Sequence, residues 1–123
     1  MNTYLGIELG STRIKAVSID EKYTPVSSAD YTWASDYENG IWTYDLAQAF
    51  DGLKTALAGI ENRESVKAMG ISAMMHGYLA FDEDWQLLVP FRTWQNTITA
   101  QSASELTELF GFNIPQRWSI AHL

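Results

Sequence analysis

The chain has 123 residues, of which 46% are hydrophobic and 19% are charged, a composition typical of one soluble globular domain or of part of a larger one. Its formal net charge of -7 argues against nucleic acid as a partner, because no basic patch is present to neutralise phosphates. The chain has no cysteine, which excludes a disulfide framework and a cysteine-based zinc site.

The N-terminal segment lacks the pattern of a secretory signal peptide. Glu8 interrupts the first apolar run and no basic leader precedes it, so a signal peptide is not predicted. No apolar run approaches the length of a membrane span. We therefore expect a cytoplasmic protein without a membrane partner.

The first third of the chain is predicted to form an antiparallel meander. Tyr4–Leu9 and Ile14–Ile19 have the composition of short strands, and the turn Gly10–Thr12 joins them. Asp20–Lys22 forms a second turn, and Val26–Trp33 provides a third strand. These elements predict a sheet in which three strands, consecutive in the sequence, pair as an antiparallel meander.

After the polar turn Ser35–Gly40 the hydrophobic period becomes helical. The apolar spacing predicts a helix over Asp45–Leu57, with Asp45 as its cap and Gly59 placed to end it. Val66–Met74 then forms a nearly continuous apolar run, which is typical of a strand buried on both faces. A crossover helix would lay this strand parallel to an earlier one.

The last third adds a hairpin and helices. Tyr78–Phe81 and Leu87–Val89 flank an acidic turn, and Thr99–Phe110 is a second helix closed by a glycine. Pro115 begins a further helix that would run to Leu123 without a terminating signal. We therefore expect an α/β fold with a mixed sheet, from a fragment of a longer protein.

The first candidate site is the turn Gly10–Thr12 with Glu8 shortly before it. Backbone N–H groups and hydroxyls at a hairpin tip, beside a carboxylate that can hold a metal, are the parts needed to bind nucleotide phosphates. A glycine-containing hairpin is also common as a purely structural turn. The carboxylate within an apolar strand favours the functional interpretation, because a buried acid needs a cation or a hydrogen-bond network.

The second candidate site is the segment Met75-His76-Gly77, directly after the apolar run Val66–Met74. The C-terminal ends of such strands hold ligand contacts in α/β folds. His76 can hydrogen-bond a polar ligand, and Gly77 allows the backbone to approach closely. A single histidine is, however, more often structural.

The third candidate site, Pro90–Asn96, combines an arginine, a tryptophan and two amides. Sugar sites use this mixture, with an aromatic face for the ring and amides for the hydroxyls. A core tryptophan with a polar flank is the alternative. The remaining tryptophans and the methionines nearby are expected to be packing residues: Trp33, Trp42, Trp85, Trp118, Met69, Met74 and Met75.

Three segments in this order resemble the N-terminal region of the FGGY carbohydrate kinases, a family that includes xylulokinase, fuculokinase, ribulokinase and glycerol kinase. The segments are Gly6–Val17, Ile71–Gly77 and Arg92–Gln95. The Met-His-Gly element is more similar to xylulokinase than to glycerol kinase. The resemblance spans essentially the whole chain but covers only the first part of a family member, which is several times longer.

The resemblance implies an actin-like (RNase H-like) ATPase fold with two lobes, of which residues 1–123 form an incomplete first lobe. ATP and Mg²⁺ would bind largely through the second lobe, and the sugar mostly through the first. The implied roles are metal binding for Glu8, phosphate binding for Gly10, Ser11, Thr12 and Arg13, and sugar binding for Met75, His76, Gly77, Trp94 and Gln95.

The chain departs from the family pattern in three places. Glu8 replaces the usual aspartate, and Met74 stands where the family has glutamine. Asn96-Thr97-Ile98 follows Trp94-Gln95, where an acid and then an arginine are common in the family. The resemblance implies that the aspartate acting as catalytic base is expected beyond Leu123, so no residue of this chain is assigned that role.

The resemblance implies transfer of the ATP γ-phosphoryl group to a hydroxyl of a ketose or related polyol by the full-length parent, with the fragment inactive alone. The first alternative is a pseudokinase or sensor, that is, a non-catalytic actin-like module that binds ATP or a sugar. Glu8 and the changes after Trp94 favour this alternative. The second alternative, an unrelated structural domain, predicts a topology without the meander and crossover helix. A truncated lobe is expected to expose apolar surface, through which copies of the chain can self-associate into a homo-oligomer.

Overall fold

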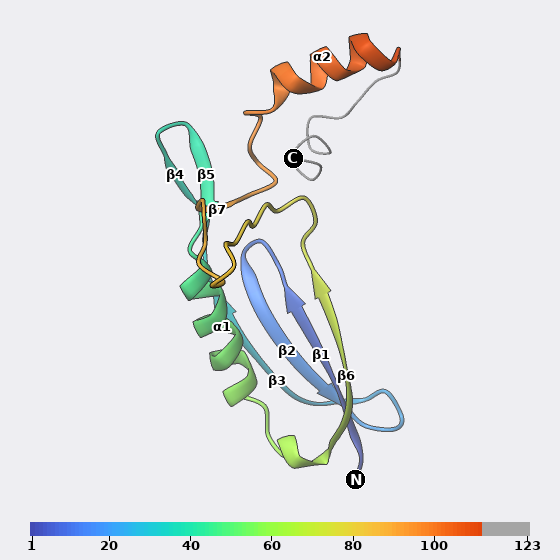
Figure 1. Cartoon of the computed structure of the whole chain (residues 1–123). Helices are drawn as coiled ribbons and strands as arrows, with labels where there is room; N and C mark the ends of the chain where they lie inside the picture. The colour runs from blue at the N-terminus through green and yellow to red at the C-terminus, as the bar shows by residue number, and fades with distance from the viewer. Residues whose placement is uncertain (112–123) are drawn as a thin grey trace. The chain divides into compact units, whose positions relative to one another are not determined.

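The computed structural model describes residues 1–111, which belong to two compact units (Figure 1). The first unit consists of Met1–Ala34 and Leu46–Met74, and the second of Ser35–Asp45 and the chain from Met75 onwards. The helix expected from Pro115 to Leu123, and Trp118 within it, lie outside the described residues.

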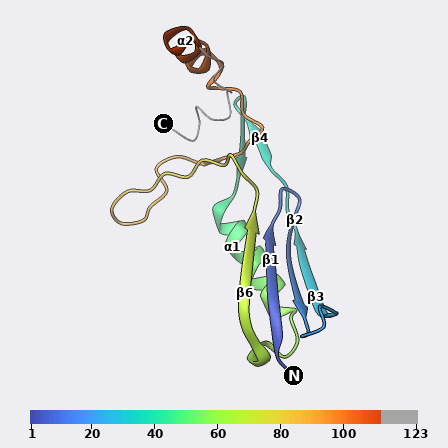
Figure 2. The ribbon, with the colours of Figure 1, turned by 90° about the vertical axis from the view of Figure 1, so that its right-hand side faces the viewer.

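The first unit contains a four-stranded mixed sheet. Strands β1 (Thr3–Leu9), β2 (Arg13–Ile19) and β3 (Pro25–Thr32) form the expected antiparallel meander. Strand β6 (Val66–Ala73) pairs with β1 in parallel, which gives the order β3-β2-β1-β6 seen in Figure 2. The predicted meander and crossover are therefore confirmed, and the unrelated domain without them is excluded.

Helix α1 (Leu46–Ala58) provides the crossover and packs against β2 and β3. Along β1 and β2 every second side chain is buried on the sheet face that α1 covers. Each fully buried leucine or isoleucine there stabilises the fold by about 1.5–3 kcal/mol. The buried apolar residues of this unit are Leu5, Ile7, Ile14, Ala16, Trp33, Ala56 and Ile60.

The expectation that Val66–Met74 is buried on both faces is wrong. Met69 is 64% exposed and Ile71 is 66% exposed. Both lie beside buried residues of β1 on the face where α1 packs, but β6 is the edge strand of the described sheet and α1 lies over β2 and β3. Met69 is therefore not core fill, whereas the expected exposure of apolar surface is confirmed.

The second unit contains a hairpin that the sequence interpretation treated only as a polar turn. Strand β4 (Asp36–Glu38) pairs with β5 (Ile41–Tyr44), which pairs with the short strand β7 (Phe91–Arg92). Asn39 and Gly40 connect β4 and β5 with φ values of 52° and 79°. Two positive φ values are typical of the type I′ hairpin turn, so the Asn-Gly pair was the signal for this hairpin.

The acidic hairpin in the second unit forms as a turn rather than as two regular strands. The Asp82 carboxylate accepts hydrogen bonds from the backbone of Asp84 (3.0 Å) and Gln86 (2.8 Å). Phe81 and Leu87 make an isolated antiparallel bridge. Trp85 at the tip is 80% exposed, so its expected role as a packing residue is wrong.

Helix α2 (Ala100–Phe110) is confirmed close to its predicted bounds. Gly111 ends it in the left-handed region, with a φ of 71°, and donates its N–H to the Thr107 carbonyl at 2.9 Å.

Gly52 sets how closely α1 approaches the sheet. A Cβ at this position would lie 2.5 Å from Tyr31 Cδ1 and 2.8 Å from Ile14 Cδ1. Gly→Ala in an exposed helix stabilises by about 1 kcal/mol, but here the added methyl must displace a fully buried isoleucine. We expect Gly52→Ala to lower the free energy of unfolding by about 1–3 kcal/mol in urea denaturation.

Lys54→Ala on the same helix is the matched control, because its side chain is 79% exposed. Its free energy of unfolding should stay within about 0.5 kcal/mol of the wild-type value. A Gly52→Ala protein as stable as the wild type would contradict the packing interpretation.

Candidate functional site

The turn between β1 and β2 is closed by one short backbone hydrogen bond. Gly10 donates its N–H to the Arg13 carbonyl at 2.9 Å, which leaves Ser11 and Thr12 as a two-residue loop. A Cβ at Gly10 would lie only 2.8 Å from the Arg13 oxygen, closer than real contacts allow. The tight turn therefore requires glycine at position 10.

Trp33 braces this turn from the protein interior. Its indole Nε1 donates to the Gly10 carbonyl at 2.8 Å, and its backbone N–H donates to the Thr12 carbonyl at 3.1 Å. The side chain is only 5% exposed, so the expected packing role is confirmed and a bracing role is added. Ser11, Thr12 and Arg13 remain exposed at the tip. Two carbonyls of the turn are thus engaged by Trp33, while hydroxyls and a cation face solvent.

Glu8 is not the buried acid that the sequence interpretation assumed. Its side chain is 51% exposed, and its Oε2 lies 3.3 Å from Lys15 Nζ. The alternation of β1 explains this, because Leu5 and Ile7 face the core and Glu8 points to the opposite face. Glu8 Oε1 lies 3.7 Å from a Cβ position built on Gly10, so the carboxylate is next to the turn.

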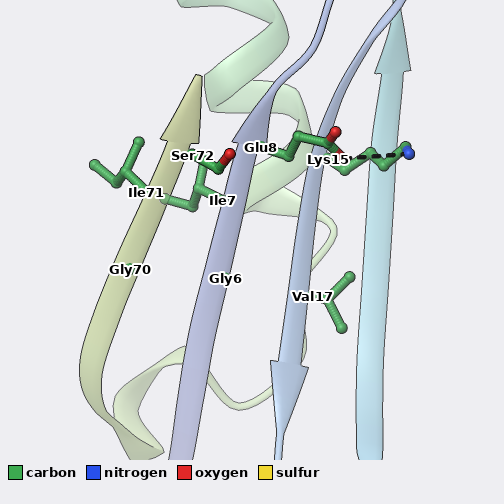
Figure 3. Close-up of a pocket in the computed structure, with 8 residues that line it drawn as sticks. All are labelled: Gly6, Ile7, Glu8, Lys15, Val17, Gly70, Ile71 and Ser72. Atoms are coloured by element: carbon green, nitrogen blue, oxygen red, sulfur yellow. Dashed lines mark ion pairs between the residues drawn. The ribbon is translucent and has the colours of Figure 1, made fainter. Parts of the chain in front are cut away.

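Glu8 and Lys15 lie at one end of a shallow groove on this face of the sheet (Figure 3). Two glycines in register on adjacent strands, Gly6 and Gly70, leave the middle of the groove without side chains. Val17 and Ser72 also line the groove, as do Ile7 and Ile71, although strand alternation directs the side chains of these two isoleucines to the face where α1 packs.

Residues 1–111 contain no group of three acidic, histidine or cysteine side chains that could enclose a metal ion. A single exposed carboxylate beside a phosphate-sized turn fits Mg²⁺, which usually keeps several waters and binds through one or two carboxylates together with substrate phosphates. The donor set around Glu8 is therefore compatible with Mg²⁺ held partly by a nucleotide.

Arg13 has an acidic neighbour as well. Its guanidinium lies 3.4 Å from the Asp30 carboxylate, with the two side chains 56% and 49% exposed. Such exposed pairs contribute at most about 1 kcal/mol, so Arg13 can exchange this partner for a phosphate at little cost.

The strands that precede the first two candidate segments end together. β6 runs parallel to β1, and Met74 at the end of β6 donates its N–H to the Leu9 carbonyl at 3.0 Å. Leu9 directly precedes Gly10, and Met74 directly precedes Met75. The topology therefore places the end of β6 beside the start of the Gly10 turn.

In the second unit, the Met75-His76-Gly77 segment has a constrained backbone. His76 has a φ of 61°, in the left-handed region that only a few per cent of non-glycine residues adopt. A Cβ at Gly77 would lie 2.8 Å from the Phe91 ring, so a larger residue here would have to displace that ring. Met75 is 72% exposed, which makes its expected role as core fill wrong.

The structure brings the second and third candidate segments together. Tyr78, next to Gly77, exchanges two backbone hydrogen bonds with Arg92, at 3.0 and 3.1 Å. Arg92 lies two residues before Trp94, which is 36% exposed. Gln95 is half-buried and accepts a hydrogen bond from Ser35 Oγ at 3.0 Å.

The predicted site residues thus fall into two groups, one in each unit. Glu8, Gly10, Ser11, Thr12 and Arg13 belong to the first unit, and Met75, His76, Gly77, Trp94 and Gln95 to the second.

Sequence reasoning placed Asn96 in the third candidate segment as one of two amides suited to sugar hydroxyls, but the structure buries this amide against the β5 backbone. No local pattern indicates its bonds to a strand 54 residues away.

The helices within residues 1–111 are all too short or too polar to cross a membrane.

Comparison with known proteins identifies the relatives of this chain. Residues 3–117 match the model of the FGGY family of carbohydrate kinases, N-terminal domain. A xylulose kinase of Klebsiella pneumoniae is 28% identical over 109 residues, which cover 85% of this chain and 23% of that protein. The chain thus spans about a quarter of the length of the curated relatives it matches.

Solved structures agree with this match. A xyloylose kinase from Brucella ovis superposes with a TM-score of 0.81 at 28% identity, over 89% of this chain and 24% of that one. A ligand-bound xylulose kinase from Lactobacillus acidophilus gives a TM-score of 0.74 at 22% identity, over 91% and 23% of the two chains, which supports the fold alone. The fold is therefore the actin-like fold of sugar kinases, in a mixed sheet with few helices. The chain belongs to the FGGY family of carbohydrate kinases.

Proposed function

We propose that the protein containing this chain transfers the γ-phosphoryl group of ATP to a hydroxyl of a ketose or related polyol, with Mg²⁺, in the cytoplasm. The chain forms an incomplete first lobe. The observation that carries the proposal is the family match over residues 3–117, combined with a braced, glycine-dependent turn beside a carboxylate. Relatives named xylulose kinases make D-xylulose the first substrate to test.

The first unit would contribute to phosphate and metal binding. Ser11 and Thr12 are exposed at the hairpin tip, where hydroxyls and backbone N–H groups can donate to phosphate oxygens. Arg13 adds a positive charge, and Glu8 would hold Mg²⁺ through water or directly. Mg²⁺, when bound, neutralises charge on the phosphates during transfer.

The second unit would contribute to sugar binding. His76 and Gln95 offer hydrogen bonds to hydroxyls, and the partly exposed Trp94 offers an aromatic face. The left-handed backbone of His76 supports this role, because residues held in sparsely populated conformations cluster at ligand sites. The contribution of these residues is positioning, which is the main source of catalysis in phosphoryl transfer.

A pseudokinase or sensor of the same fold is the second candidate. The observation that favours it is the ion pair of Glu8 with Lys15 at 3.3 Å, since the lysine neutralises the carboxylate that a metal would need. Such a protein would bind ATP or a sugar without transferring phosphate.

Substrate-dependent ATP consumption separates these two functions. We expect the full-length protein to consume ATP with at least one member of a panel of pentuloses, hexuloses and polyols that includes D-xylulose, and to release the sugar phosphate. Sugar binding in calorimetry without ATP turnover on any member would contradict the kinase and favour the sensor.

Glu8→Gln tests the metal role with a side chain of the same shape but without charge. We expect kcat to fall at least about tenfold, with a higher half-saturating Mg²⁺ concentration, because a carboxylate binds Mg²⁺ better than an amide does. Glu61→Gln is the control, since no hydrogen bond or ion pair is formed by its side chain within residues 1–111. Unchanged Mg²⁺ dependence in Glu8→Gln would contradict the assigned role.

His76→Asn tests the sugar role without a large change in stability. Asparagine tolerates the left-handed region, so the free energy of unfolding should change by less than about 0.5 kcal/mol. Loss of one hydrogen bond to the sugar should raise the sugar KM roughly 3- to 10-fold. The KM for ATP provides the internal control, and an equal rise in both KM values would argue against a sugar-specific contact.

A further inference from the structure

Asn96 is a buried amide whose side-chain hydrogen bonds within residues 1–111 all go to the backbone. It is 3% exposed. Its Oδ1 accepts from the Trp42 N–H at 2.8 Å, and its Nδ2 donates to the carbonyls of Trp42 at 2.7 Å and Thr93 at 3.0 Å. Backbone N–H groups only donate and carbonyls only accept, so the orientation of this amide is unambiguous.

These bonds dock the turn of residues 93–96 onto strand β5. Thr93 also donates its N–H to the Trp42 carbonyl at 3.1 Å, and its side chain is only 1% exposed. Trp94 and Gln95 lie between the two anchored residues. The backbone of the predicted sugar-binding pair is therefore held from both ends.

The side-chain oxygen of Gln95 is already engaged by two hydroxyls. Ser35 Oγ donates to Gln95 Oε1 at 3.0 Å. The Thr93 hydroxyl accepts from the Gln95 N–H at 3.1 Å and directs its own hydrogen to Oε1 at 3.4 Å. Among residues 1–111 the Nε2 group of Gln95 has no partner, which leaves it as a hydrogen-bond donor.

We propose that Asn96 is a positioning residue that docks the Trp94-Gln95 turn on β5 and thereby presents Gln95 Nε2 as a donor to a hydroxyl or carbonyl oxygen of the sugar. The proposal rests on the proposed sugar kinase function. In this chain an ionised aspartate at position 96 would set an oxygen against the carbonyls of Trp42 and Thr93, whereas the Asn96 amide donates to both.

The test measures kcat, the KM for D-xylulose and the KM for ATP in the full-length protein. Gln95→Glu exchanges the Nε2 donor for an acceptor, and we expect its D-xylulose KM to rise at least about tenfold with the ATP KM within about threefold. Asn96→Asp should have the same selective effect, and the double variant should be no worse than the poorer single variant, because Asn96 acts through Gln95.

The pH dependence of Asn96→Asp distinguishes positioning from general destabilisation. Burial and the carbonyls of Trp42 and Thr93 would raise the pKa of a carboxyl at this position, so a rise in pH converts a protonated acid that donates one hydrogen bond into an ionised acid that the carbonyls repel. The D-xylulose KM of Asn96→Asp should therefore rise with pH relative to wild type. Asn96→Ala, which cannot titrate, should show an elevated KM whose pH dependence follows wild type.

Ser35→Ala keeps the proposal testable if the position 96 variants fail to fold. It removes one hydroxyl that orients the Gln95 amide and leaves all bonds of Asn96 in place. We expect a three- to tenfold rise in the D-xylulose KM, with the melting temperature within a few degrees of wild type. An active wild type whose D-xylulose KM is unchanged in Ser35→Ala and Gln95→Glu would overturn the inference.

Failure of the proposed function has a different pattern. A wild-type protein that neither phosphorylates nor binds D-xylulose or any other sugar of the panel overturns both proposals. If the wild-type protein binds the sugar without turnover, the same variants are compared by their Kd for the sugar in calorimetry. Weaker binding in the order expected for the KM values supports the inference, and an unchanged Kd contradicts it.

Discussion

The parallel pairing of β6 with β1 is the constraint on which the rest of the first unit depends. Seven register partners hold the two strands together, and α1 is the crossover that makes this pairing accessible to the chain. Because the strands are parallel, their C-terminal ends lie at the same edge of the sheet. One end leads into the Gly10 turn and the other into Met75-His76-Gly77. An antiparallel β6 would end at the opposite edge of the sheet.

The two groups of candidate residues are held by different physical means. In the first unit the turn is fixed through its backbone, by the short contact that requires Gly10 and by the indole of Trp33. In the second unit the Trp94-Gln95 turn is fixed by the buried side chain of Asn96 and by the backbone N–H of Thr93, which both bind backbone groups of Trp42 on a distant strand. In both turns the hydrogen bonds that hold the backbone come from buried residues, Trp33 and Asn96, while other polar groups of the turn stay accessible.

The charges around the Gly10 turn are balanced locally. Lys15 faces Glu8 and Arg13 faces Asp30, at 3.3 and 3.4 Å. Each pair is about half exposed, so it contributes at most about 1 kcal/mol and can be opened by a stronger partner. In the proposed function, a nucleotide phosphate at the turn would attract Lys15 and Arg13, and its Mg²⁺ would attract Glu8. The cations next to the turn can therefore attract an anionic ligand even though the whole chain has a net charge of -7.

The sequence by itself determined the three-stranded meander, helix α1, the crossover and the glycine-dependent turn, because strand alternation, helical spacing and turn chemistry are properties of neighbouring residues. It also determined the family, through three motifs in a fixed order. Only the tertiary structure decided that Glu8 is exposed and paired with Lys15, that β6 is exposed, and that Asn96 clamps Trp42. The physical reason is that burial and hydrogen bonding depend on which elements pack together, and Asn96 finds its partner 54 residues away.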